Sequence, residues 1–262
     1  MQAAVSQALP VLVLENVSRS FRAGLAGCIA DARALDRVSL VVRRGEIVLL
    51  TGRRGSGKTT LLHCAAGIMT PDSGRLSWGG LSKRPKWIAL ATARDLGHAA
   101  PTVGESIEES IGSSTHSVWN IDALVTRAMR IAGLDVPRLT SLTHLTPRDR
   151  SRLRIARAVT RAYIECGEIR CLLIDGSADA EPLALRANDL HALERQLGCA
   201  VIAAANSLGI DGCAVPRTLI LEHGRLIADL KHLAIRPEPA RVPAKVHRSP
   251  VLTDVDPLPA LL

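Results

Sequence analysis

The feature that most constrains the fold is the glycine-rich stretch GRRGSGKTT at residues 52–60. It fits the pattern G-x-x-x-x-G-K-[ST], follows the apolar run EIVLLT at 46–51, and opens a segment at 57–68 that suits a helix. A strand, a glycine-rich loop and a helix in this order are typical of a loop that cradles phosphate. The stretch therefore predicts an α/β protein that holds a nucleoside triphosphate. The alternative is a glycine-rich turn without a ligand.

The residues of the loop have different expected roles. Glycines allow successive backbone N–H groups to point at phosphate oxygens, and the helix N-terminus adds a positive dipole end. Lys58 is expected to reach the β and γ phosphates, and the Thr59 hydroxyl to ligate Mg²⁺. Solvated loop tips are the alternative interpretation for Arg53 and Arg54. The candidate phosphate-binding residues are Gly52, Arg53, Arg54, Gly55, Ser56, Gly57, Lys58, Thr59 and Thr60.

Short apolar runs alternate with helical patterns along most of the chain, which predicts an α/β fold with a largely parallel sheet. A hairpin is predicted at 218–230, with its turn at His223-Gly224. The run CLLID at 171–175 is typical of a strand buried on both faces. The other predicted strands are 11–17, 38–43, 46–51, 75–79, 87–91 and 200–206, and the predicted helices are 57–68, 104–112, 120–133, 148–165 and 181–197.

Composition limits the classes of function. The net charge is +8, but the basic residues are spread along the chain and aromatic residues make up only 2%, so no nucleic-acid partner is expected. A solvated basic surface explains the charge, and an anionic lipid surface is the alternative. The six cysteines form no CxxC pair, and several lie in apolar runs, so they are predicted to be small buried side chains in a reducing compartment rather than zinc ligands.

The sequence carries no pattern of a signal peptide or a spanning helix. The longest apolar run, CAVIAAA at 199–205, is far shorter than the roughly 20 residues that a bilayer requires. The chain is therefore predicted to be cytoplasmic, with any membrane role exerted through a partner. Residues 233–262 are rich in proline and lack periodicity, which predicts a flexible tail after a domain at 11–232.

The order of these elements resembles the nucleotide-binding subunit of ATP-binding-cassette (ABC) transporters, from about Leu12 to Asp229. LENVSRSF and ALDRVSLVVRRGEIVLLTG are similar to the opening sheet of that family, and LLHCAAGIMTPDSGRLSWGG is similar to its continuation, with some likeness to the branch that exports lipoproteins or macrolides. The resemblance implies a P-loop NTPase of ABC type. It has a mostly parallel core sheet, an antiparallel N-terminal β region and a helical subdomain at about 92–165.

The resemblance also implies roles for two single residues. Phe21 stands where the family places an aromatic ring that stacks on adenine, and a core phenylalanine is the alternative interpretation. Asp175, at the end of CLLID, stands where the family places the aspartate that holds Mg²⁺, and an ordinary strand-end carboxylate is the alternative.

The family's signature Leu-Ser-Gly-Gly-Gln corresponds here to LTPRD at 145–149. In the family, the serine and the glycine amides of this signature clamp the γ-phosphate of a nucleotide held by the opposite subunit. Pro147 has no N–H to donate, Arg148 adds bulk where backbone must approach closely, and Asp149 brings negative charge toward phosphate. The loss of each hydrogen bond to a charged group is expected to cost about 1.5–3 kcal/mol.

Three other positions depart from the family pattern. Gly176 replaces the catalytic glutamate that activates water, and 177–180 also differ from the intersubunit loop. Asn206 replaces a histidine that contacts the γ-phosphate, and it cannot act as a protonatable switch. No glutamine stands around Ala91-Thr92-Ala93, where the family has one that touches Mg²⁺. No catalytic residue is therefore predicted.

The combined pattern predicts an ATP-binding subunit of an ABC-type transporter that binds Mg-ATP with weak or absent hydrolysis and acts as a structural or regulatory partner. The implied partners are a membrane permease and a second ABC-type subunit, identical or not, which would hold the chain on the inner face of the cell membrane. The alternatives are an active transport ATPase with drifted motifs, an interaction module that binds no nucleotide, and an ABC-type protein of nucleic-acid handling, for which the chain is too short.

Overall fold

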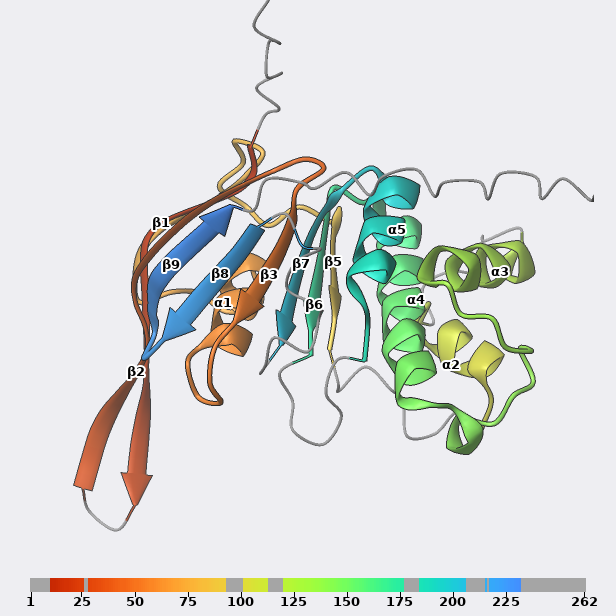
Figure 1. The fold of residues 1–262 in the computed structure, drawn as a ribbon, viewed down its shortest axis with the longest axis horizontal. Coiled ribbons are helices and arrows are strands. Elements are labelled where there is room, and N and C mark those ends of the chain that lie inside the picture. The colour runs from red at the N-terminus through yellow and green to blue at the C-terminus, as the bar shows by residue number, and fades with distance from the viewer. Residues whose placement is uncertain are drawn as a thin grey trace, which may run out of the picture.

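The computed structural model describes residues 10–25, 28–92, 101–112, 120–176, 184–205, 215 and 217–231 (Figure 1). Within these ranges the chain forms two β-sheets and a group of helices. The predicted tail at 233–262 and the positions Ala93, 177–180 and Asn206 lie outside the described residues.

The smaller sheet is antiparallel and has the order β2-β1-β4. It contains β1 (Pro10–Leu25), β2 (Cys28–Arg43) and β4 (Ser73–Trp78). The predicted strands at 11–17 and 38–43 are confirmed, but both are much longer, and together they form a hairpin that extends away from the rest of the molecule (Figure 1). The sequence underestimated these strands because their outer residues are held by pairing across the hairpin, from Arg19 with Leu35 to Leu25 with Cys28, and such pairing depends on context more than on local sequence.

The larger sheet has the order β5-β6-β7-β3-β8-β9. All neighbouring strands in it are parallel except β8 and β9, which form the hairpin predicted at 218–230 with a turn at His223 and Gly224. The strands are β3 (Ile47–Thr51), β5 (Ile88–Ala91), β6 (Cys171–Asp175), β7 (Ala200–Ala205), β8 (Arg217–Glu222) and β9 (Arg225–Lys231).

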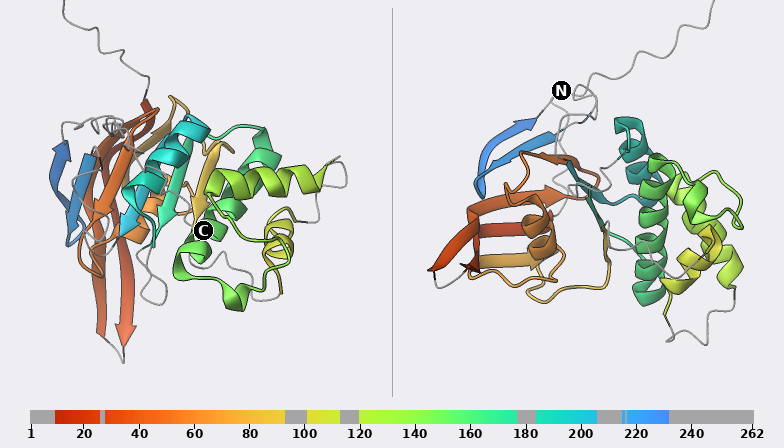
Figure 2. Two further views of the ribbon diagram at one scale, coloured as in Figure 1. Left: turned by 45° about the vertical axis from the view of Figure 1, so that its right-hand side comes forward. Right: turned by 90° about the horizontal axis from the view of Figure 1, so that it is seen from below.

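Both faces of the larger sheet are buried, which explains the continuous apolar runs of its strands. Val48 and Leu50 of β3 pack with α1 (Lys58–Ala65) and the antiparallel sheet. Ile47 and Leu49 belong to a second core shared with the remaining helices, which lie on the opposite side (Figure 2). These helices are α2 (Val103–Glu109), α3 (Ile121–Ala132), α4 (Pro147–Cys166), α5 (Ala187–Leu197) and the short 3₁₀ helix Leu142–His144.

The helix predictions are largely confirmed. The segments at 104–112, 120–133 and 148–165 correspond to α2, α3 and α4 with small shifts of their ends. The segment predicted as a helix at 181–197 is helical from Ala187 in the described part.

The cysteine prediction holds only in part. Cys64, Cys171 and Cys199 are buried, whereas Cys166 is exposed at the end of α4, where its apolar neighbours face the core but the last turn meets solvent.

Candidate nucleotide-binding site

The predicted phosphate loop lies between the end of β3 and the start of α1, so the strand–loop–helix context is confirmed. Gly57 is the N-cap of α1 in a left-handed conformation (φ 104°), and Gly52 also has a positive φ (151°). The candidate residues from Gly52 to Thr60 lie in this loop and in the first turn of α1, directly after β3. Arg53 and Arg54 are exposed there, while Ser56 is buried.

Two glycines of the loop are required by the protein itself. A Cβ atom on Gly57 would lie 2.2 Å from the carbonyl oxygen of Ala34 in β2, and one on Gly52 would lie 2.1 Å from the carbonyl oxygen of Leu221 in β8. A Cβ on Gly55 would meet nothing within 4 Å. The loop is therefore wedged between β2 and β8 on two sides, and it is open at Gly55, where space remains for a ligand.

Lys58 is turned inward and holds the loop closed on itself. Its ammonium Nζ donates to the carbonyl oxygens of Gly52 (2.8 Å) and Arg53 (2.9 Å) and to the hydroxyl of Ser56 (3.3 Å), and only 3% of the residue is exposed. This position places a full positive charge under the backbone of the loop. An anion that entered the loop would meet this charge together with the amino end of α1.

Asp175 lies at the same edge of the sheet as the loop. β3, β7 and β6 are adjacent and parallel, and Thr51 is level with Ala205 while Asp175 is level with Ala204. Two strand spacings, about 9–10 Å, therefore separate the backbones of Asp175 and the first loop residues. The Asp175 residue is 7% exposed. Topology thus brings Asp175 to the sheet edge from which the loop starts, although the two segments are more than one hundred residues apart, while Thr59 lies after the loop in the first turn of α1.

Phe21 lies on the long β1–β2 hairpin and is 38% exposed, so the alternative interpretation as a core residue is wrong. It is paired with Ala32, two residues before the Ala34 that touches the loop. The guanidinium of Arg19 lies 5.4 Å from the centre of its ring. An exposed aromatic ring on the strand pair that borders the loop is a suitable surface for stacking a base.

The position after Asp175 carries no functional side chain. Gly176 is buried, and its N–H donates to the carbonyl oxygen of Ala204 (3.0 Å), so the backbone continues the β6–β7 ladder. Nothing at this residue can accept a proton or orient water. Thr92, which follows β5, is part of the described chain and is not a glutamine.

The segment 145–149, aligned with the family signature, forms the beginning of α4. Thr146 is the N-cap: its Oγ1 accepts the N–H of Asp149 (3.2 Å) and donates to the Asp149 carboxylate (2.6 Å). Pro147 is the first helical residue and has no N–H. The amino end of α4 is therefore occupied by its own residues, and its positive dipole end faces a carboxylate.

Arg148 points away from this helix end, toward α5. Its Nη2 donates to both carboxylate oxygens of Asp189 (2.8 and 3.0 Å), and Arg152 donates to one of them (2.9 Å). Burial raises the pKa of the Asp189 carboxyl, but hydrogen bonds from the Arg186 backbone and from the two guanidinium groups outweigh it, so the pKa lies below its usual range. The beginning of α4 is thus tied to the beginning of α5.

Two residues whose hydrogen bonds hold this region in place were not predicted from the sequence. The turn at Gly224 contacts the phosphate loop, because its N–H donates to the carbonyl oxygen of Ser56 (3.0 Å). Asp189 anchors the segment aligned with the signature. The sequence marked Gly224 as a turn residue, but contacts between segments so far apart leave no local signal.

Among the described residues, no group of three or more His, Cys, Asp or Glu side chains is placed to hold a metal ion. No helix in the described ranges is both long and apolar enough to cross a bilayer.

The fold and the loop define an α/β protein of the P-loop nucleotide-binding class. The sequence profile of the ABC transporter family matches residues 35–163. A hemin import ATP-binding protein, HmuV, of Bradyrhizobium diazoefficiens is 30% identical over 83% of this chain and 82% of its own length. HmuV of Rhodopseudomonas palustris (strain BisB18) is 29% identical over 77% and 78%. This chain belongs to the ABC transporter ATP-binding family.

Other relatives extend the comparison. The spermidine/putrescine import ATP-binding protein PotA of Pseudomonas aeruginosa is 28% identical over 83% of this chain, which spans 58% of that protein. A solved structure of the ATP-binding cassette MJ0796, a dimer bound to ADP and Pi, has the same fold, with a TM-score of 0.64 and 18% identity over 84% of this chain and 98% of its own. HmuV and PotA are named for import, and the likeness to an exporter branch stays an untested prediction.

Proposed function

We propose that this chain is the ATP-binding subunit of an ABC-type import transporter, and that it binds Mg-ATP with weak or absent hydrolysis. In this role ATP is a structural or regulatory ligand that stabilises one conformation or one assembly. The observation that carries the proposal is a contrast between two segments at the same edge of the larger sheet. The phosphate loop is intact after β3, while Gly176 stands after β6 where the family has its glutamate.

The binding half of the proposal rests on the loop. The amides between Gly52 and Thr60, together with Lys58, supply donors and positive charge for the phosphates. The Thr59 hydroxyl and the Asp175 carboxylate are oxygen donors of the kind that Mg²⁺ prefers, and Asp175 lies at the sheet edge from which the loop leads to Thr59. Phe21 is proposed to stack on adenine, because it is exposed beside the loop.

The catalytic half is argued from what Gly176 cannot do. A glycine offers no group to orient or deprotonate the attacking water, and the loss of a general base typically lowers a rate by about 10²–10⁴. Bound Mg²⁺ would neutralise phosphate charge but would not replace this base. The chain is therefore proposed to keep nucleotide far longer than an intact relative does.

The segment at 145–149 supports the same conclusion. If two such subunits pair head to tail, each nucleotide lies between the phosphate loop of one and the signature of the other. The first turn of α4 is capped by Thr146 and Asp149 and begins at Pro147, so it offers a γ-phosphate few free N–H groups and a nearby negative charge. Pairing with itself leaves both composite sites without the glutamate, the histidine and the family signature. Pairing with an intact relative leaves the site on this chain's phosphate loop without glutamate and histidine, and the site on the partner's loop with the altered signature.

The remaining parts of the proposal concern assembly. We propose a membrane permease and a second ABC-type subunit, identical or not, as partners, because the relatives are named as import ATP-binding proteins. Such partners would hold the chain at the cytoplasmic face of the membrane. The proposed unit is a nucleotide-binding domain at 11–232 with a helical subdomain at about 92–165, followed by a tail at 233–262.

Two measurements on the purified chain test the proposal: the equilibrium affinity for Mg-ATP, and steady-state phosphate release with and without a copurifying permease. We expect saturable binding that Lys58→Ala abolishes, with turnover well below 1 s⁻¹. Turnover above about 1 s⁻¹, the ordinary range of enzymes, that disappears in Lys58→Ala would instead establish an active transport ATPase, the alternative that similarity to import ATP-binding proteins favours. Absence of binding would leave an interaction module.

A further inference from the structure

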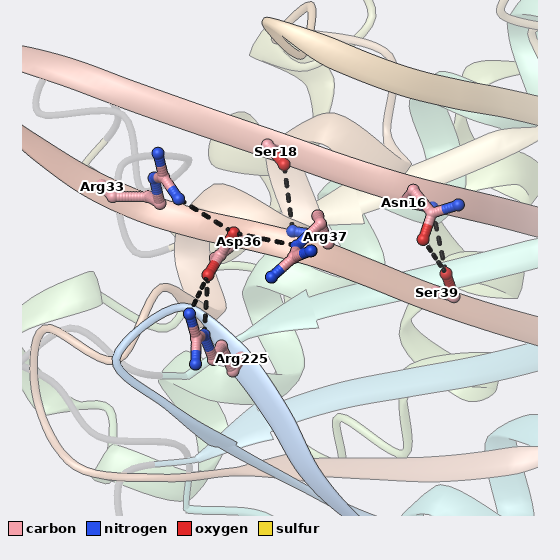
Figure 3. Close-up of polar contacts among 7 residues, drawn as sticks. All are labelled: Asn16, Ser18, Arg33, Asp36, Arg37, Ser39 and Arg225. Atoms are coloured by element: carbon pink, nitrogen blue, oxygen red, sulfur yellow. Dashed lines mark hydrogen bonds and ion pairs between the residues drawn. The ribbon is translucent and has the colours of Figure 1, made fainter.

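A polar cluster surrounds Asp36 of β2, next to the phosphate loop (Figure 3). The Asp36 side chain is only 4% exposed, while the three arginines that face it are 62–73% exposed. Arg225 donates through Nε (2.7 Å) and lies 2.6 Å away through Nη2, both at Oδ2. Arg33 donates to Oδ1 (3.1 Å), and the Nε of Arg37 lies 3.6 Å from the same oxygen.

Only one of these contacts joins separate elements. Arg33 and Arg37 belong to β2, the strand of Asp36 itself, whereas Arg225 is the first residue of β9, directly after the turn at His223 and Gly224. Arg225 also makes the shortest contacts with the carboxylate. The ion pair of Asp36 with Arg225 therefore fastens the β8–β9 turn to β2.

The backbone carries this attachment on to the phosphate loop. The N–H of Asp36 donates to the carbonyl oxygen of Gly224 (2.8 Å), and the N–H of Gly224 donates to the carbonyl oxygen of Ser56 (3.0 Å). Gly224 thus uses both of its polar groups, one on β2 and one on the loop. A displacement of the turn would shift the peptide that joins Ser56 to Gly57, just before α1.

The surroundings leave the turn and the loop little room to adjust separately. A Cβ on Gly224 would lie 2.7 Å from the carbonyl oxygen of Ala34, and a Cβ on Gly57 would lie 2.2 Å from the same atom. The turn and the loop therefore pack against one peptide of β2, two residues before Asp36. Close-packed backbone of this kind transmits a shift rather than absorbing it.

We propose that Asp36 and Arg225 are positioning residues for nucleotide binding: their ion pair fixes the β8–β9 turn, which in turn fixes the phosphate loop through Ser56. This inference rests on the proposed binding of Mg-ATP by the loop. In this role both side chains act through the turn and the loop rather than as ligands of the nucleotide. In support, the hydrogen bond from Arg225 lowers the pKa of the Asp36 carboxyl below its usual range against the opposing effect of burial, so the carboxylate stays charged and available to the arginine.

The test measures the Kd for Mg-ATP of the full chain by equilibrium titration, at a temperature where circular dichroism shows each variant folded. Arg225→Gln and Asp36→Asn are expected to raise the Kd about tenfold, which corresponds to weakening one hydrogen bond to a charged phosphate. Arg225→Lys, which keeps the charge and one donor, is expected to restore part of the affinity. The double variant is expected to bind no more weakly than the weaker single one, because both changes break one link.

Two matched variants separate positioning from general destabilisation. Arg37→Gln removes a different guanidinium group from the Asp36 carboxylate, one that comes from β2 itself. Asp229→Asn removes the charge of a carboxylate that pairs with Arg217 (2.7 Å) within the β8–β9 hairpin. Both are expected to leave the Kd within about twofold even where they lower the melting temperature. Wild-type affinity in Arg225→Gln, or an equal loss in Arg37→Gln, would overturn the inference. If the wild type binds no Mg-ATP, the proposed function itself fails.

Discussion

Gly55 and Gly57 lie two residues apart in the phosphate loop, and their surroundings differ sharply. Both have positive φ, which costs a residue with a side chain about 1–2 kcal/mol. A methyl group on Gly57 would also collide with the carbonyl of Ala34, at 2.2 Å, whereas one on Gly55 would meet open space. Gly57→Ala is therefore expected to lower the free energy of unfolding by about 1–3 kcal/mol more than Gly55→Ala does, as measured by urea denaturation.

The comparison of these two variants carries its own control, because both introduce the same methyl group into the same loop. Equal losses of stability would mean that the contact between Gly57 and β2 contributes nothing. The motif spacing assigned both residues to a phosphate loop, with Gly57 at a fixed glycine position and Gly55 at a variable one. It could not predict which glycine packs against protein and which faces open space, because Ala34 and Leu221 reach the loop only through the tertiary fold.

The contact between the beginning of α4 and the beginning of α5 is expected to stabilise the fold to an extent that depends on pH, because it is made by the Asp189 carboxylate. The folded-state pKa of this carboxyl lies below that of the unfolded chain, about 4. Its stabilising contribution is therefore complete above that unfolded value and disappears as the pH falls through the lower folded one. Asp189→Asn is expected to lower the free energy of unfolding at pH 7 by about 1–3 kcal/mol, toward the lower end because solvent partly screens Arg148.

The measurement compares urea unfolding of the wild type and Asp189→Asn from pH 7 down to pH 2. The difference between them is expected to shrink at the acid end, where the wild-type carboxyl is itself protonated. A difference that stays constant over this range would show that the hydrogen bonds of Asp189, rather than its charge, hold Arg148 and Arg152 in place.

Elements differed in how well the sequence predicted them. The helix α3 was predicted closely because its apolar residues recur on one face, Asn120 caps its first turn and Gly133 ends it. The β1–β2 hairpin was predicted only at its base. Its outer part is held by pairing between the two strands, from Arg19 with Leu35 to Leu25 with Cys28, and this pairing joins residues that lie outside both strands predicted from the sequence.

At the scale of the whole molecule, sheet topology creates the candidate site. Asp175 and the loop come together only because β7 inserts between β3 and β6 with all three strands parallel. The same topology places Gly176 next to the proposed nucleotide, at the edge where the family keeps its glutamate. In the proposed head-to-tail pair, the beginning of α4, on the helical side of the sheet, would face the nucleotide of the partner subunit. The two proposed defects of one chain, at Gly176 and at 145–149, would therefore act on different nucleotides, and each nucleotide of a homodimer would meet one defect from each subunit.

This arrangement predicts how hydrolysis would return in a homodimer. Gly176→Glu supplies the missing base, but each nucleotide would still face the capped helix of the opposite subunit. Replacing LTPRD at 145–149 with Leu-Ser-Gly-Gly-Gln frees that helix end but supplies no base. Each change alone is expected to raise phosphate release by less than about tenfold, and the combined variant by about 10² or more, because the two groups act in the same transition state.

The combined variant carrying Lys58→Ala is the control, since it keeps both repairs and loses the phosphate loop lysine; it is expected to release phosphate no faster than the wild type. Each repaired protein must also bind Mg-ATP, so that a failure to fold is not mistaken for a failure to hydrolyse. A large gain from Gly176→Glu alone would show that the beginning of α4 does not limit the reaction. A combined variant as slow as the wild type, with Mg-ATP bound, would place the block elsewhere, and the positions that depart from the family outside the described residues, Asn206 first, would be the next to replace.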